Sequence, residues 1–299
     1  MLQILFVLGN VSAIARNIAT LALLLLLLPF NLAMVLLSWL KNLISGRGES
    51  GIPPTRNPIE KNRILITGAK MTKALQLARS FHRDGHEVYL VETHKYWLSG
   101  HRFSRAVKGF FTVATPEKDP DGYCQDILNI VQKNKIDLFI PVSSPIASYY
   151  DSLAKKTIDP YCESLHLDPE ETKILDDKHA FCSKAREFGL SAPKVFRITD
   201  PRQILYFDFS NESNKYIVKS IPYDSVLRLD LTRLPFEEME DYVKSLPISE
   251  AKPWVMHEFI RGQEYCFHAT VRKGKIRLHC CSESSPFQVN YQQADNPAI

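Results

Sequence analysis

Residues 63–92 contain two short apolar runs separated by an amphipathic segment, and this alternation constrains the fold more than any other feature of the sequence. Arg63–Thr67 predicts a buried strand that ends at Gly68. Met71–Asp84 has apolar residues at helical spacing, and His86–Glu92 predicts a second strand. A strand, a helix and a second strand within roughly thirty residues form a right-handed parallel unit.

The same alternation continues further along the chain. Tyr123–Asn134 predicts another helix, and Ile136–Val142 predicts another strand. Nearly continuous apolar strands are typical of a parallel sheet that helices cover on both faces. The sequence therefore predicts a Rossmann-like α/β domain over residues 63–165. The turn after its first strand, GAKMTKA, lacks two glycines of a dinucleotide-binding turn, which argues against NAD.

Polar and aromatic residues follow the predicted strands. Lys70 and Lys73 lie where a helix begins, a place that suits an anionic substrate, although a solvated helix face explains them more simply. The predicted loops 94–103 and 143–150 are rich in Tyr, Trp, His and Arg, and ligands bind at this end of open sheets. A small polar ring compound fits such loops; aromatics packed as a satellite core are the alternative. The candidate substrate residues are Lys70, His94, Tyr96, His101 and Arg102.

The N-terminal region has a different composition. Ile18–Leu40 is uncharged and rich in leucine, and as a helix it spans about 35 Å, enough to cross a bilayer. We expect residues 1–44 to form an apolar membrane anchor and residues 45–62 a flexible linker. A cleaved signal peptide is the alternative, although the apolar core is long and lacks a small-residue cleavage site. Pro29 leaves both a kinked span and a re-entrant hairpin open.

Charge and cysteine content indicate where the protein is located and which partners it can have. Lys41, Arg47 and Arg56 follow the apolar stretch, which places the rest of the chain on the cytoplasmic side of a membrane. The six cysteines show no CxxC spacing, so reduced thiols are expected. A net charge of +4, with no basic run interleaved with aromatics, gives no reason to expect nucleic acid as a partner.

Residues 166–299 predict a second domain of the α+β class. Its elements are a helix over Asp168–Phe188, strands over Tyr216–Ser220 and Trp254–Ile260, and a hairpin of Tyr265–Val271 with Ile276–Cys281. The hairpin turn has Gly274 where positive φ is required.

Two lysines and one acid in this domain suit a nucleotide. Lys219 lies inside an apolar strand, where a buried ammonium requires an anion such as a phosphate. Lys178 precedes it on a helix, although a single lysine is usually a surface residue. Glu264 follows a glycine after the strand, where a carboxylate can accept hydrogen bonds from both ribose hydroxyls. A solvated turn acid is the alternative for Glu264.

In this order, Lys178, Lys219, the hinge His257–Ile260 and Glu264 resemble the motif positions of the ATP-grasp superfamily. The resemblance implies that the lysines meet the phosphates, the hinge backbone pairs with adenine and the acid binds ribose. His257 departs from the family, in which Glu is common at that position. The segment after Lys219 lacks the family's Gly-rich loop, but its hydroxyl and guanidinium groups suit phosphate. The candidate ATP-binding residues are Lys178, Lys219, Ser225, His257, Glu258, Phe259, Ile260 and Glu264, with Arg228 as a candidate phosphate stabiliser.

A closer resemblance covers nearly the whole chain. The runs KMTKALQLARSFH, HKYWLSGHRFS, ASYYDSLAKK, LDDKHAF and LRLHCCS resemble the mycosporine-glycine synthase family, which belongs to the ATP-grasp ligases of mycosporine-like amino acid biosynthesis. The resemblance implies an enzyme that joins glycine to 4-deoxygadusol while ATP becomes ADP and phosphate. Phosphorylation of the enolic oxygen makes a good leaving group, which the amine then displaces. The resemblance leaves the oligomeric state open.

The resemblance also implies Mg²⁺ or Mn²⁺, whose ligands in the family follow positions like Asn290–Ile299. We therefore expect an ATP-grasp domain that is incomplete at its C-terminus, with metal ligands after Ile299, and we expect the chain alone to be inactive or weak in catalysis. A non-catalytic ATP- or metabolite-binding remnant is one alternative. An ATP-grasp ligase for another carboxylate and amine is the other.

Overall fold

The computed structural model describes residues 2–44, 60–221, 227, 230–285 and 292–294. The chain forms two compact units, Met1–Pro58 and Ile59–Ile299. Most of the predicted linker and the candidate residues Ser225 and Arg228 lie outside the described residues. The predicted division of the larger unit at residue 165 stays a prediction.

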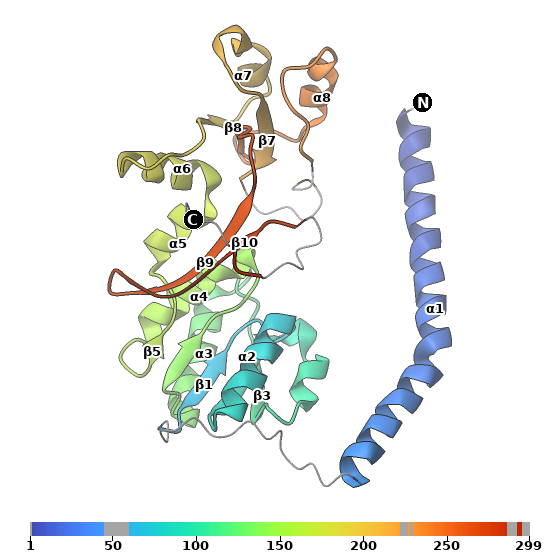
Figure 1. Ribbon diagram of the computed structural model, residues 1–299, viewed down its shortest axis with the longest axis vertical. Helices are drawn as coiled ribbons and strands as arrows, with labels where there is room; N and C mark the ends of the chain where they lie inside the picture. The colour runs from blue at the N-terminus through green and yellow to red at the C-terminus, as the bar shows by residue number, and fades with distance from the viewer. Residues whose placement is uncertain (1, 45–59, 222–226, 228–229, 286–291, 295–299) are drawn as a thin grey trace. The chain divides into compact units, whose positions relative to one another are not determined.

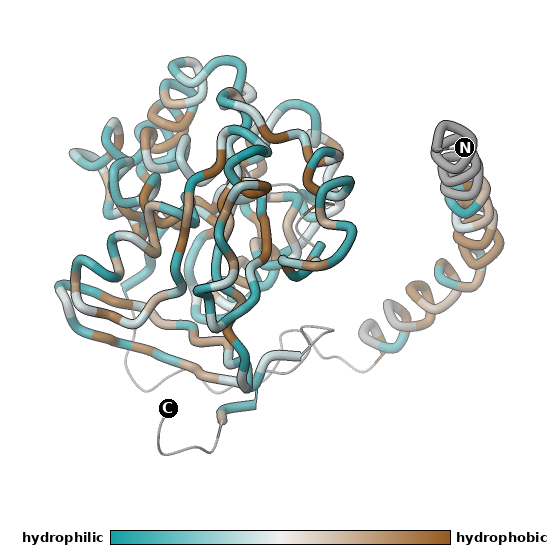
Figure 2. Tube along the Cα trace, turned by 90° about the horizontal axis from the view of Figure 1, so that it is seen from above, coloured by the Kyte–Doolittle hydropathy of each residue, from teal (hydrophilic) through white to brown (hydrophobic). Residues whose placement is uncertain are grey.

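The described part of the N-terminal unit is one helix, α1 (Leu2–Ile44), which continues through Pro29 (Figure 1). The structure therefore has a continuous helix where the sequence left a re-entrant hairpin open. Its segment Ala15–Leu37 is long and apolar enough to cross a membrane, and Figure 2 shows its hydropathy along the trace. No part of this segment is buried. A signal sequence meets the same criteria of length and composition, so both alternatives remain.

The larger unit begins with a parallel sheet of five strands in the order β3-β2-β1-β4-β5. Ile64 of the central strand pairs with Val88 on one side and Leu138 on the other. The strands are β1 (Arg63–Ile66), β2 (Glu87–Thr93), β3 (Gly109–Val113), β4 (Leu138–Ile140) and β5 (Glu163–Ser164). The predicted parallel sheet is confirmed, with two strands, β3 and β5, that the sequence analysis missed.

Helices cover both faces of this sheet, as the apolar strands predicted. Ile64 and Ile66 pack with α2 (Thr72–Arg83), whereas Leu65 between them packs with α3 (Pro120–Asn134) and α4 (Pro145–Ile158). Alternate residues of a strand point to opposite faces, so one short apolar run supplies two hydrophobic cores.

A second, antiparallel sheet has the order β6-β8-β7, and a separate two-stranded hairpin follows it (Figure 1). The strands are β6 (Val195–Ile198), β7 (Tyr216–Ser220), β8 (Trp254–Glu258), β9 (Tyr265–Arg272) and β10 (Lys275–Glu283). The helices of this region are α5 (Pro169–Asp176), α6 (Lys178–Glu187), α7 (Arg202–Leu205) and α8 (Met239–Ser245). Gly274 has φ of 70° at the hairpin turn, as its position predicted.

Three predicted segments differ from the structure. The single helix predicted over residues 168–188 is two helices, because the Asp177 carboxylate accepts hydrogen bonds from the amides of His179 and Ala180 and starts α6 anew. Most of the loop predicted over residues 143–150 belongs to α4, in which Pro145 occupies the first turn. The strand predicted to end at Ile260 ends at Glu258.

The exposed leucines of α1 generate a first prediction. The double variant Leu24→Arg, Leu26→Arg places two charges in the middle of the span, at a cost of about 5–7 kcal/mol of insertion free energy. We expect the full chain to move from the carbonate-resistant membrane fraction to the soluble fraction. Ile44→Arg, which lies outside the span, serves as the control and leaves the fractionation unchanged. Recovery of wild-type chains that lack residues 1–44 from the cell would contradict a retained anchor.

Candidate functional site

The antiparallel sheet packs one face on a hydrophobic core. Its other face, which we call the polar face, carries Lys219 and His257 beside the buried Val255 and Ile217. Met256 and Val218 point into the hydrophobic core beneath the sheet. Because side chains alternate along a strand, Lys219 and His257 belong to the opposite face, where Lys219 pairs with Val255 and His257 with Ile217. The sheet thus places two basic side chains on the face away from its core.

Lys178, at the start of α6, reaches the end of the same strand. Its Nζ donates hydrogen bonds to the carbonyls of Ser220 (3.1 Å) and Ile221 (3.3 Å), directly after Lys219. The Nζ of Lys219 donates to the carbonyl of Asp230, and the residue is only 9% exposed. The structure therefore brings together two lysines that lie far apart in the sequence.

The electrostatics of this group favour an anion. Burial lowers the pKa of Lys219, and the nearby charge of Lys178 lowers it further against the opposing effect of Asp230. Partial burial likewise lowers the pKa of Lys178, although much of its side chain is exposed. Burial lowers the pKa of His257, and both lysines add to that effect. A bound anion would relieve the mutual repulsion, so the three basic groups fit a polyphosphate.

Two of the other hinge residues, Glu258 and Phe259, already make hydrogen bonds within the protein. The carboxylate of Glu258 accepts from the Lys194 amide (3.1 Å) and from Asn214 Nδ2 (2.7 Å), so this side chain secures the edge of the sheet. The amide of Phe259 donates to the Lys215 carbonyl at 2.7 Å. Ile260 is exposed and carries the next amide along the chain, so it is the better placed of these residues to face an adenine.

Glu264 lies just before β9 and is exposed. Its backbone carbonyl accepts a hydrogen bond from the amide of Ser284 at 2.9 Å. The described contacts do not join its carboxylate to Lys178 or Lys219, so its ribose contact stays a prediction.

A cavity of about 230 Å³ lies at the carboxyl ends of the parallel strands. The residues that line it include Thr67, Lys70, Glu92, Tyr96, Tyr123 and Ser143. Gly68, at the end of β1, has φ of 66°, and a Cβ atom there would lie 2.8 Å from the Ser143 Cα. Only glycine fits this turn, which lets β1 and the segment after β4 approach each other at the cavity wall.

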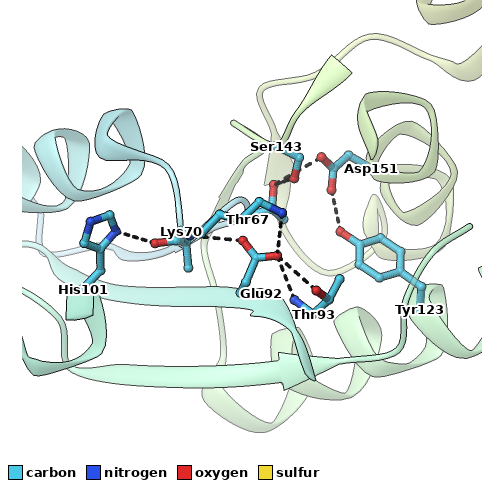
Figure 3. A network of polar contacts seen from close by, with 9 residues as sticks. Thr67, Lys70, Glu92, Thr93, His101, Tyr123, Ser143 and Asp151 are labelled. Carbon is cyan, nitrogen blue, oxygen red and sulfur yellow. Dashed lines mark hydrogen bonds and ion pairs between the residues drawn. The ribbon is translucent and has the colours of Figure 1, made fainter. Parts of the chain in front are cut away.

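One wall of the cavity is organised by a buried carboxylate on α4. Asp151 is fully buried and accepts hydrogen bonds from Tyr123 Oη (2.6 Å) and Thr67 Oγ1 (3.2 Å) (Figure 3). Ser143 Oγ donates to Thr67 Oγ1 at 2.9 Å. Burial raises the pKa of Asp151 to about 6, against the hydrogen bonds that lower it. Tyr123 donates its hydroxyl proton to Asp151, and Ser143 donates its own to Thr67. The oxygens of Tyr123 and Ser143 therefore keep lone pairs that can accept hydrogen bonds from a ligand in the cavity.

The opposite wall carries a buried acid and a lysine. Glu92, at the end of β2, accepts from the amides of Lys70 (3.1 Å) and Thr93 (3.0 Å). The Lys70 ammonium lies 3.5 Å from Glu92 Oε1 and 4.1 Å from the centre of the Tyr96 ring. A cation held between a carboxylate and an aromatic face is pre-positioned for a polar ligand.

The five predicted substrate residues divide into two groups. Lys70 and Tyr96 line the cavity, whereas the described lining does not include His94, His101 or Arg102. His101 hydrogen-bonds the Ala69 carbonyl, and the Arg102 guanidinium donates to the Trp97 carbonyl, so both side chains are engaged elsewhere. His94 is exposed on the short 3₁₀ turn that follows β2.

Sequence reasoning did not single out several polar residues of this site, among them Thr67, Glu92, Tyr123 and Asp151. Ser143 lies in the segment 143–150, which the sequence predicted to meet a ligand. The position of Glu92 at the end of an apolar strand could have identified it, because ligands bind at the carboxyl ends of the strands of a parallel sheet. Asp151 gave no such signal, because an acid on a helix is usually solvated.

No family model matches the chain, and no curated protein sequence matches it. Among solved structures, it is similar to an L-amino acid ligase from Bacillus licheniformis, with 14% identity over 80% of this chain and 56% of that one and a TM-score of 0.59. It is also similar to an ADP complex of N5-carboxyaminoimidazole ribonucleotide synthetase (9% identity, 80% of this chain and 58% of that one, TM-score 0.56). An ATP complex of the Aspergillus clavatus synthase gives 11% identity, 75% and 54% coverage, and a TM-score of 0.55.

The likeness supports the predicted fold class, in which a Rossmann-like parallel sheet is followed by an α+β region of the ATP-grasp fold. The chain spans little more than half the length of each of these neighbours. At 9–14% identity, the likeness concerns the fold.

Asp151 generates a prediction about pH and stability. Because its folded pKa is raised from 3.8 to about 6, the neutral carboxyl stabilises the fold at low pH, and this contribution is lost as the pH rises through 6. Relative to Asp151→Asn, the wild type should lose about 2 kcal/mol of unfolding free energy between pH 4 and pH 7, most of the roughly 3 kcal/mol that the difference in pKa allows at ~1.36 kcal/mol per pKa unit. Denaturant melts of both proteins at several pH values measure this difference. The exposed Asp159→Asn is the control, and a pH-independent difference for Asp151→Asn would show that the carboxyl is not buried.

Proposed function

We propose that this protein is an ATP-dependent ligase that forms a carbon–nitrogen bond. The observation that carries the proposal is the convergence of Lys178, Lys219 and His257 on the polar face of the β6-β8-β7 sheet. Burial is the main cause of their lowered pKa values, and the charge of Lys178 also acts on Lys219 and His257, so an anion bound here would be favoured. Solved neighbours of the same fold include complexes with ATP and ADP, which supports a nucleotide as the anion.

The proposed chemistry needs charge neutralisation and positioning. The acceptor's enolic oxygen attacks the γ-phosphorus of ATP, and ADP leaves. The amine then adds to the acceptor carbon and loses a proton while the carbon–oxygen bond breaks and phosphate leaves. Lys178 and Lys219 hold the phosphates and offset the charge that spreads over the phosphoryl oxygens. No covalent bond to the protein is required.

The cavity at the end of the parallel sheet is the proposed acceptor site. Lys70 would pair with an enolate or phenolate-like oxygen, while the acceptor wall of Tyr123 and Ser143 would receive hydrogen bonds from ring hydroxyls. A volume of about 230 Å³ suits one small ring compound. Together with the resemblance of the sequence, these features support 4-deoxygadusol as acceptor and glycine as amine.

A divalent metal, Mg²⁺ or Mn²⁺, would accompany ATP in such a reaction and would neutralise part of the charge on its phosphates. Within the residues that the structure describes, no group of three or more His, Cys, Asp or Glu side chains is arranged to hold a metal. The proposal therefore assigns the ion no protein ligand in these residues. In the proposed setting, α1 holds the protein at a membrane with the ligase domains in the cytoplasm.

Two variants separate the nucleotide site from the acceptor site. Lys219→Gln removes a buried cation that Lys178 repels, so we expect an equal or higher melting temperature without ligand and the loss of the shift caused by ATP. Lys70→Gln should keep the ATP shift and lose the shift caused by 4-deoxygadusol. In the wild type, ATP at 100 times its dissociation constant should add about 2.7 kcal/mol of stability, several degrees in melting temperature.

Lys252→Gln is the matched control, because Lys252 is an exposed lysine in the turn before β8. It should respond to both ligands as the wild type does. An ATP shift that survives Lys219→Gln would overturn the nucleotide site. A shift with ATP but none with 4-deoxygadusol would favour another acceptor, and ligand binding without release of ADP would favour a non-catalytic binding protein.

A further inference from the structure

The connection between β2 and β3 presents large apolar side chains to solvent. We define the aromatic loop as residues 94–105, which include the 3₁₀ turns η1 (His94–Tyr96) and η2 (Gly100–Phe103). Trp97, Leu98 and Phe103 are 57%, 61% and 71% exposed. Tyr96 lines the acceptor cavity, but these three residues do not belong to its described lining, so the cavity does not account for them.

The loop is held in one conformation by Arg102. Its Nη1 donates to the Trp97 carbonyl, and its guanidinium carbon lies 6.0 Å from the Trp97 ring, 5.8 Å from the Phe103 ring and 5.3 Å from the Phe110 ring. Backbone hydrogen bonds of the two 3₁₀ turns add to this order. An apolar surface that is already ordered loses little conformational entropy when it binds a partner.

The charge of the loop is entirely positive. Lys95, Arg102 and Arg105 lie within it, and residues 94–105 contain no Asp or Glu. Basic residues around exposed Trp, Leu and Phe are the composition of segments that lie in the interface of an anionic bilayer. The aromatic rings enter the headgroup region while the cations pair with lipid phosphates and carboxylates.

We propose that the aromatic loop docks on an anionic lipid surface, with Trp97, Leu98 and Phe103 inserted at the level of the headgroups. Three apolar side chains are too few for the core of a stable protein interface, which buries about 800 Å² on each partner. They are enough for shallow membrane insertion, where affinity is shared between apolar burial and charge. The proposal concerns a surface distinct from the nucleotide cluster and does not depend on the proposed ligase activity.

The apolar helix α1 supports a lipid partner over a protein partner. If Ala15–Leu37 crosses the bilayer, residues 45–62 reach at most about 60 Å, at ~3.4 Å per residue. The aromatic loop would then be tethered to the membrane, and docking would be an intramolecular step with a raised effective concentration. Even weak insertion would then be populated.

Tryptophan fluorescence of the full chain tests the proposal. The chain has three tryptophans, of which Trp254 is buried and Trp39 belongs to α1. In a Trp39→Phe background, the lipid-dependent signal therefore reports on Trp97. We expect brominated acyl chains to quench Trp97 in vesicles of mixed phosphatidylcholine and phosphatidylserine, and to quench it less in phosphatidylcholine alone.

A charge reversal provides the matched comparison. Arg105→Glu should weaken docking by about 30-fold, as expected for two lost unit charges near an anionic surface, and should lower the quenching accordingly. Arg83→Glu, an exposed arginine outside the aromatic loop, should leave the quenching unchanged. Equal Trp97 emission in brominated and ordinary lipids would overturn the proposal, as would quenching that is the same in both vesicle types. Near-ultraviolet circular dichroism confirms that each variant is folded.

Discussion

Repulsion among three basic groups is the interaction on which the account of this protein depends. Lys178, Lys219 and His257 approach one another on one side of a small antiparallel sheet, and burial lowers the pKa of each. Nearby lysine charge lowers the pKa of Lys219 and His257 further, whereas Asp176 and Asp177 oppose the shift at Lys178. Carbonyls of the β7 end and of Asp230 accept hydrogen bonds from the two ammonium groups. The fold thus stores an unfavourable charge arrangement that an anionic ligand would relieve, as at many binding sites.

The parallel sheet has the opposite charge arrangement at the end where the cavity lies. There the buried groups are acids, and each is supplied with donors: Glu92 with the Lys70 and Thr93 amides, Asp151 with two hydroxyls. Hydroxyl protons that point toward Asp151 leave oxygen lone pairs facing the cavity. The buried carboxylate therefore determines which groups a ligand meets, although it does not itself line the cavity.

The sequence predicted the elements whose side chains alternate between two cores, because periodicity records packing directly. It missed β3, whose residues are mostly half-buried, and it merged α5 with α6 because the capping role of Asp177 is a local hydrogen bond rather than a pattern. Lys219 stood out because its neighbours are apolar. Asp151 did not, since its burial comes from α3 packing against α4, a contact between distant segments. The aromatic loop divides in the same way: Tyr96 lines the cavity as the ligand-loop prediction implied, whereas Trp97 and Phe103 are exposed to solvent.

Chemical mapping with an acyl phosphate of ATP tests the central claim most directly. Such a probe transfers its acyl group to amines near the phosphates, and lysines with a lowered pKa react faster because more of the neutral amine is present. The account predicts that mass spectrometry finds both Lys178 and Lys219 acylated, that excess ATP prevents this, and that the exposed Lys252 is not protected. Acylation of other lysines alone, or labelling of Lys178 and Lys219 that ATP does not prevent, would contradict it.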